Sequence, residues 1–92
     1  MTQSKADGAD RRPTLETQKQ LAEAVRWLRF ERRWSQEELA ERSGVHRTYI
    51  SQVEHAKCST GLKQIERIAQ AFGLSVAELF TYAEKLRGRE IK

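Results

Sequence analysis

Several features that define common protein classes are scarce in this chain of 92 residues. Its single cysteine, Cys58, rules out an intramolecular disulfide, and with only His46 and His55 beside it the chain lacks the spacing of a zinc site. No run approaches the roughly 20 apolar residues that cross a bilayer, and the N-terminus lacks the apolar segment of a signal peptide. These absences argue against disulfide-stapled, zinc-bound and membrane proteins, and they fit a cytoplasmic protein.

The residue groups that support catalysis are also missing. We find no nucleophile–base–orienter set, no metal cluster and no glycine-rich loop of the kind that cradles phosphates. The acidic residues Glu37, Glu38 and Glu41 form one solvated helix surface rather than a catalytic pair. We therefore expect no enzyme activity and no cofactor. A chain of this length also has no room for a separate domain that binds a small-molecule effector.

What the chain does have is charge, with an excess of one sign. Lys and Arg number 17 and Asp and Glu 13, which gives a formal net charge of +4. A basic balance favours polyanionic partners, although many small soluble proteins are as basic as this one. The hydrophobic fraction of 38% is too high for wholesale disorder, so we expect one domain with one modest core.

Apolar residues recur at helical spacing, and no segment alternates long enough to suggest a sheet. We therefore predict an all-α, compact domain of five helices within residues 15–87, with residues 88–92 as a C-terminal tail. Residues 1–14 lack periodicity and are predicted to be a disordered tail, in which Arg11 and Arg12 could act as a basic arm. The first helix covers residues 15–33 and ends in a cluster of positive charge.

Two capping boxes mark helix starts. Ser35 precedes Glu38 by three residues, and Ser75 precedes Glu78 in the same way. In such a box the hydroxyl accepts a hydrogen bond from the backbone N–H three residues later, and the carboxylate reaches back. Gly44 is expected to end the short second helix in a left-handed conformation, which glycine adopts at little cost.

The segment 46–55 is an unusually polar helix. At about 100° per residue its apolar stripe spans only about 100°, and the opposite side carries hydrogen-bonding groups and few acids. Ala40 and Gly44 allow the preceding helix to cross it closely at a tight corner. This is the layout of a helix-turn-helix, whose second helix enters the major groove of DNA. The side chains predicted to read base edges are Arg47, Thr48, Ser51 and Gln52.

The stretch WSQEELAERSGVHRTYISQVEHAK, followed by LKQIERIAQAFGLSVAELF, resembles the phage-repressor-like helix-turn-helix family of transcription regulators, the Cro/C1 or XRE type. The run HRTYIS is also similar to the controller proteins of restriction–modification systems. The resemblance implies a lambda-repressor-like fold, a double-stranded DNA partner, and a structural ion pair between Arg29 and Glu54. It further implies phosphate contacts from Gln36, His46, Tyr49, Lys57, Ser59 and Lys63.

Three positions depart from the pattern of that family. Trp34 replaces a smaller apolar residue and is expected to extend the core. Ser43 occupies a usually apolar position and is expected to weaken the corner slightly. Gly61 replaces a frequent capping serine, so Thr60 is expected to cap the fourth helix instead.

A regulator of this kind is expected to be a homodimer, because one helix-turn-helix reads few base pairs and symmetric operators recruit two-fold dimers. The last helix has more apolar surface than a small monomer needs, and we predict the dimer contact there, at Leu79, Phe80, Ala83 and Leu86.

Two other functions remain open from the sequence. One is an antitoxin-type protein-interaction module that also regulates its own operon. The other is RNA binding, which is disfavoured because the exposed face lacks stacking aromatic residues.

Overall fold

The structure is a computed structural model that describes residues 15–57 and 61–91, with the backbone alone at residues 15 and 87–91. The predicted tail of residues 1–14, and Cys58, Ser59 and Thr60, lie outside the described residues. The prediction of an all-α fold is confirmed, because the described residues form helices and no strand. The helices are α2 (Leu15–Arg32), α3 (Gln36–Ser43), α4 (Arg47–Glu54), α5 (Leu62–Ala71) and α6 (Val76–Ile91).

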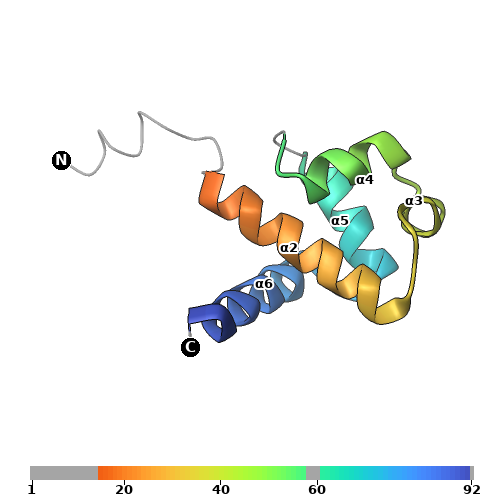
Figure 1. The fold of residues 1–92 in the computed structure, drawn as a ribbon. Helices are drawn as coiled ribbons and strands as arrows, with labels where there is room; N and C mark the ends of the chain where they lie inside the picture. Colours follow the sequence, from red (N-terminus) through yellow and green to blue (C-terminus); the bar gives the residue numbers. More distant parts are fainter. Residues whose placement is uncertain (1–14, 58–60, 92) are drawn as a thin grey trace.

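Helix α2 is the central element of the fold (Figure 1). It packs against α6 on one side and α4 on another, while α3 contacts α4 and α5, and α5 contacts α6. The helices enclose one core, to which every one of them contributes. Its largest fully buried apolar side chains are Leu39, Ile50, Ile68, Leu79 and Val25.

Trp34 extends this core, as its bulk predicts. Its ring stacks on that of Phe72 with centroids 5.5 Å apart and an interplanar angle of 11°. The guanidinium of Arg42 lies 4.4 Å from the Trp34 centroid, and that of Arg32 lies 5.1 Å from the Phe72 centroid. Cations at such distances are attracted to the ring faces, so this stack ties the end of α2 to α3 and α5.

The two predicted capping boxes differ in detail. At Ser75 the box is complete, because Glu78 N–H donates to the Ser75 hydroxyl and Ser75 N–H donates to the Glu78 carboxylate. At Ser35 the hydroxyl accepts from Glu38 N–H at 3.0 Å, but the Glu38 carboxylate instead binds Arg42 Nε at 2.7 Å. An i,i+4 ion pair along α3 therefore replaces the return bond of the box.

Two boundary predictions are corrected by the structure. Helix α6 continues to Ile91, so residues 88–91 are helical rather than a tail. Gly88 lowers helix propensity by about 1 kcal/mol relative to alanine, but it keeps its N–H and does not stop the hydrogen-bond ladder. The expectation that Thr60 caps the fourth helix is wrong, because the N-cap of α5 is Gly61, which supplies no side-chain hydrogen bond.

The predicted dimer contact is also corrected. Leu79, Ala83 and Leu86 are 0%, 2% and 6% exposed and belong to the core of the single chain. The apolar stripe of α6 therefore serves α2 and α5 within the same molecule. Of the four predicted residues, only Phe80 is partly exposed.

Candidate nucleic-acid interface

The corner between α3 and α4 has the predicted glycine. Gly44 has φ +74°, and its N–H donates to the Ala40 carbonyl at 2.9 Å, which ends α3. Ser43, expected to weaken this corner slightly, makes two local contacts: its hydroxyl accepts from Val45 N–H at 3.2 Å and donates to the Ala40 carbonyl at 3.4 Å. The polar side chain at this position therefore gives Val45 N–H a partner that an apolar side chain could not supply.

Helix α4 divides sharply between a buried side and an open side. Ile50 and Val53 are buried in the core. On the open side, Arg47, Thr48 and Gln52 are exposed, and Ser51 is half-buried at the boundary between the open and the buried side. Three of the four predicted base-reading side chains are thus accessible to a ligand, and the fourth lies at their edge.

The predicted pair of Arg29 and Glu54 holds the buried side of α4 to α2. The Arg29 guanidinium donates to both carboxylate oxygens of Glu54, with Nε to Oε2 at 2.7 Å and Nη2 to Oε1 at 2.9 Å. Glu54 is only 2% exposed. Two parallel charge-assisted bonds to a buried carboxylate make a strong and directional contact. Arg29 Nη1 also donates to the Trp34 carbonyl at 2.9 Å, which fixes the start of the α2–α3 turn.

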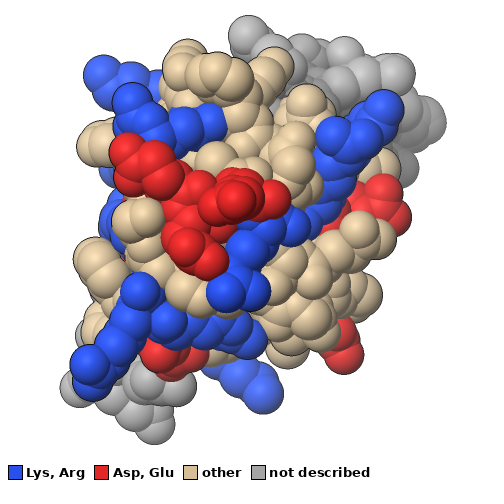
Figure 2. All heavy atoms as spheres, turned by 90° about the vertical axis from the view of Figure 1, so that its right-hand side faces the viewer, with Lys and Arg blue, Asp and Glu red and all other residues tan. Residues whose placement is uncertain are grey.

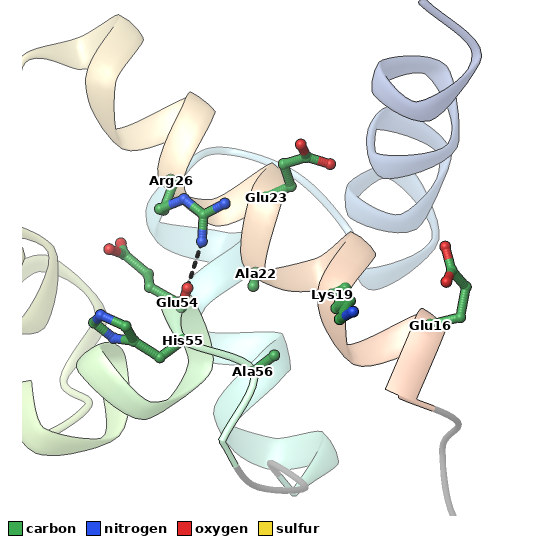
Figure 3. A pocket seen from close by; sticks show the side chains of 8 residues that line it. All are labelled: Glu16, Lys19, Ala22, Glu23, Arg26, Glu54, His55 and Ala56. Atoms are coloured by element: carbon green, nitrogen blue, oxygen red, sulfur yellow. Dashed lines mark hydrogen bonds between the residues drawn. The ribbon is translucent and has the colours of Figure 1, made fainter. Parts of the chain in front are cut away.

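A second arginine holds the end of the same helix. Figure 3 shows Arg26 of α2 reaching across a pocket to the backbone carbonyl of Glu54, to which its Nη1 donates. A cation at a helix C-terminus is favoured by the helix dipole. The sequence revealed the run of arginines but not that two of them bind one residue of α4. Together they attach the C-terminal end of α4 to α2.

The start of α4 is capped by a residue that the sequence did not single out as a cap. His46 is the N-cap, and its Nδ1 accepts from Thr48 N–H at 3.1 Å. A ring nitrogen that accepts carries no proton, so the neutral His46 ring has its proton on Nε2. Since histidine is not among the usual N-cap residues, no sequence signal pointed to this role.

The predicted phosphate contacts occupy several different environments. Tyr49, Lys57 and Lys63 are exposed, in keeping with such a role, and Ser59 lies outside the described residues. Gln36 is different, because its Nε2 donates to Glu54 Oε1 at 3.1 Å and its Oε1 accepts from Arg47. Its side chain is thus engaged within the protein, and its backbone N–H at the start of α3 is what it can offer to an anion.

The surface around α3 carries both signs of charge. In Figure 2, acidic side chains gather at the centre of the face on which α3 lies, and Lys and Arg lie around them. Helix α3 supplies acids at Glu37, Glu38 and Glu41. The sequence showed these residues as a plain solvated surface, but Glu37 Oε2 lies 3.8 Å from Arg47 Nε. An acid therefore stands directly beside the first residue of α4.

Among the described residues, no group of three or more His, Cys, Asp or Glu side chains could hold a metal ion. None of the described helices has the length and apolar character needed to cross a membrane.

Comparison with known proteins gives the family. A helix-turn-helix family model, HTH_3, matches residues 25–79, which include α3, α4 and α5, the C-terminal part of α2 and the first turn of α6. The chain belongs to this helix-turn-helix family. The match accounts for the fold, because the corner at Gly44 and the exposed side of α4 lie within it. As a helix-turn-helix protein of this type the chain is a DNA-binding regulator.

Named relatives agree with this assignment. The chain is 46% identical to control protein C.SmaI of Serratia marcescens over 61 residues, which are 66% of this chain and 73% of that protein. It is 42% identical over 59 residues to a hypothetical transcription factor of Neisseria meningitidis serogroup B, covering 64% of this chain. That match spans only 56% of the Neisseria protein.

A solved structure extends the comparison to three dimensions. The crystal structure of the restriction–modification controller protein C.Esp1396I superimposes with a TM-score of 0.68 at 28% identity. The superposition covers 75% of this helix-turn-helix chain and 88% of the controller protein.

Proposed function

We propose that this protein reads a specific operator in duplex DNA as a homodimer and regulates the genes beside it as the controller of a restriction–modification system. The observation that carries the proposal is the contrast within α4. Its inner side is clamped to α2 by Arg26 and Arg29, while its outer side presents exposed polar groups. A helix fixed in this way, with an exposed polar face, suits the major groove. There the donors and acceptors of the base edges replace the water that the helix loses on binding.

Arg47 is the proposed reader of guanine. It is the first residue of α4, half its side chain is exposed, and an arginine can donate two parallel bonds to guanine O6 and N7. Gln52 and Thr48 lie on the same open side, where an amide can pair with adenine and a threonine can contact thymine. Lys57, Lys63, Tyr49, His46 and the Gln36 backbone are proposed to contact phosphates, which position the helix without reading sequence.

The controller assignment draws on the similarity to C.SmaI and C.Esp1396I. Its test is the neighbouring DNA. A restriction endonuclease or methyltransferase gene beside this one supports it, whereas a toxin gene there favours the antitoxin alternative. Because duplex DNA is the target, we place the protein in the cytoplasm.

The DNA-reading roles are separated by two substitutions. Arg47→Ala should cost about 1–3 kcal/mol per half-site on the selected operator and relax the preference at one base pair. Lys57→Ala should weaken binding to all duplexes alike and make the dependence of log K on log salt shallower by about one. Fluorescence titrations with the operator and a scrambled duplex at several salt concentrations measure both effects. Equal losses on both duplexes for Arg47→Ala would show that Arg47 is a phosphate contact.

A further inference from the structure

The side chain of Arg47 contacts the first two residues of α3 in the unbound protein. Its Nε lies 3.8 Å from Glu37 Oε2, and its Nη1 donates to Gln36 Oε1 at 3.5 Å. Gln36 and Glu37 are the first two residues of α3, and Arg47 is the first residue of α4. The corner at Gly44 therefore brings the start of one helix against the start of the next.

The orientation of Gln36 is set by the core. Its amide nitrogen donates to Glu54 Oε1 at 3.1 Å, and Glu54 is itself fixed by two bonds from Arg29. Because the donor end of the amide is directed to this buried carboxylate, the carbonyl end faces Arg47. A chain of contacts thus runs from the core to the exposed guanidinium.

The donors that remain on Arg47 are those that guanine requires. A guanidinium has five N–H groups. Glu37 lies on the Nε side and Gln36 takes one hydrogen of Nη1. The second hydrogen of Nη1 and both hydrogens of Nη2 remain for a ligand. These three donors are enough for the two bonds that an arginine makes to O6 and N7 of guanine.

We propose that Glu37 is a specificity-determining residue that, with Gln36, positions Arg47 for a base and disfavours its capture by phosphate. The proposal rests on the DNA-binding function above. The Glu37 side chain is 76% exposed, so its charge lies open to any approaching phosphate. Phosphate carries a full negative charge and is repelled strongly, whereas guanine O6 and N7 carry only partial negative charge and are repelled less. Glu37 therefore penalises the sequence-independent contact more than the sequence-specific one.

The test compares two glutamates of the same helix. Glu37→Gln removes the charge beside Arg47, and Glu41→Gln removes an equal charge from an exposed position on α3. The probes are a duplex that the unaltered protein enriches from a randomised pool and a scrambled version of it. For Glu37→Gln the ratio of the two affinities should fall by about two- to fivefold, the range expected from an exposed ion pair. For Glu41→Gln the ratio should stay unchanged.

A double-mutant cycle shows whether Glu37 acts through Arg47. In the Arg47→Ala background, Glu37→Gln should have no more effect on the ratio than Glu41→Gln. Thermal unfolding of each variant checks that the fold is retained, since both glutamates are exposed. Equal ratios for the two single variants, or an undiminished Glu37→Gln effect without Arg47, would overturn this proposal alone. A pool without any enriched sequence would overturn the DNA-reading function and this proposal with it.

Discussion

At the scale of single residues, Glu54 joins α4 to both α2 and α3. It receives Arg29 and Gln36 through its side chain and Arg26 through its backbone carbonyl. Glu54→Ala leaves the Arg29 charge largely buried and without its carboxylate, so the free energy of unfolding should fall by about 3–5 kcal/mol. Urea unfolding followed by circular dichroism measures this loss. Glu41→Ala, at an exposed position, should change it little, and equal stability of both variants would show that the pair is not structural.

His46 gives a second prediction at this scale. Its Nδ1 accepts the Thr48 N–H and so satisfies one of the free donors of the first turn of α4. His46→Ala removes the cap and should reduce stability by about 0.5–2 kcal/mol, whereas His46→Asn should retain it because asparagine is a preferred N-cap. Thermal unfolding of the three proteins at neutral pH compares them. An asparagine variant as unstable as the alanine variant would contradict the capping role.

At the scale of the helices, α4 is flanked by two residues in the left-handed backbone conformation, Gly44 before it and Ala56 after it. Gly44 has φ +74° with open space around its α-carbon, so a methyl group there would meet no neighbour. Gly44→Ala should therefore cost about 1–2 kcal/mol from backbone conformation alone. Ala56 has φ +54° at the end of α4 and already bears that cost, so Ala56→Gly should not destabilise the protein. Chemical denaturation of both variants tests this opposite behaviour.

Gly44 and Ala56 also show which helix ends can be predicted from the sequence and which cannot. Glycine marked the end of α3, and capping serines marked the starts of α3 and α6, because each of these residues has a local physical preference. The left-handed residues Arg33 and Ala56 could not be predicted, since neither residue type favours positive φ. Their conformations are imposed by the packing of the helices that they connect.

Long-range contacts set the limit of prediction at the candidate site. The open side of α4 followed from helical periodicity, and the pairing of Arg29 with Glu54 followed from the family resemblance. The contacts of Arg47 with Gln36 and Glu37 did not, because they join two helix starts across the corner. Their geometry depends on how α3 crosses α4. Ala40 and Gly44 predict that this crossing is close, but they do not determine which side chains meet across it.

At the scale of the whole molecule, a periodic pattern shows that a helix face is apolar but not what covers it. The stripe of α6 that suggested a partner is covered by the chain's own helices, with Leu79 fully buried. Half-buried apolar side chains border this stripe, among them Val76, Phe80 and Tyr82 of α6 and Ile65 of α5. A proposed two-fold contact must use surface of this kind, since stable interfaces bury on the order of 1,200–2,000 Å² in total.

Phe80 is therefore the residue at which the proposed homodimer can be tested. Phe80→Glu places a charge in an apolar contact and should convert the dimer to a monomer at micromolar concentrations, because two-fold symmetry brings two such charges to one interface. Thr81→Glu introduces the same charge at the next, exposed position and should leave the dimer intact. Sedimentation velocity gives the mass of each variant, and far-UV circular dichroism confirms that each is helical. If the unaltered protein sediments only as a monomer, no dimer exists; if Phe80→Glu stays a helical dimer, the contact lies on another face.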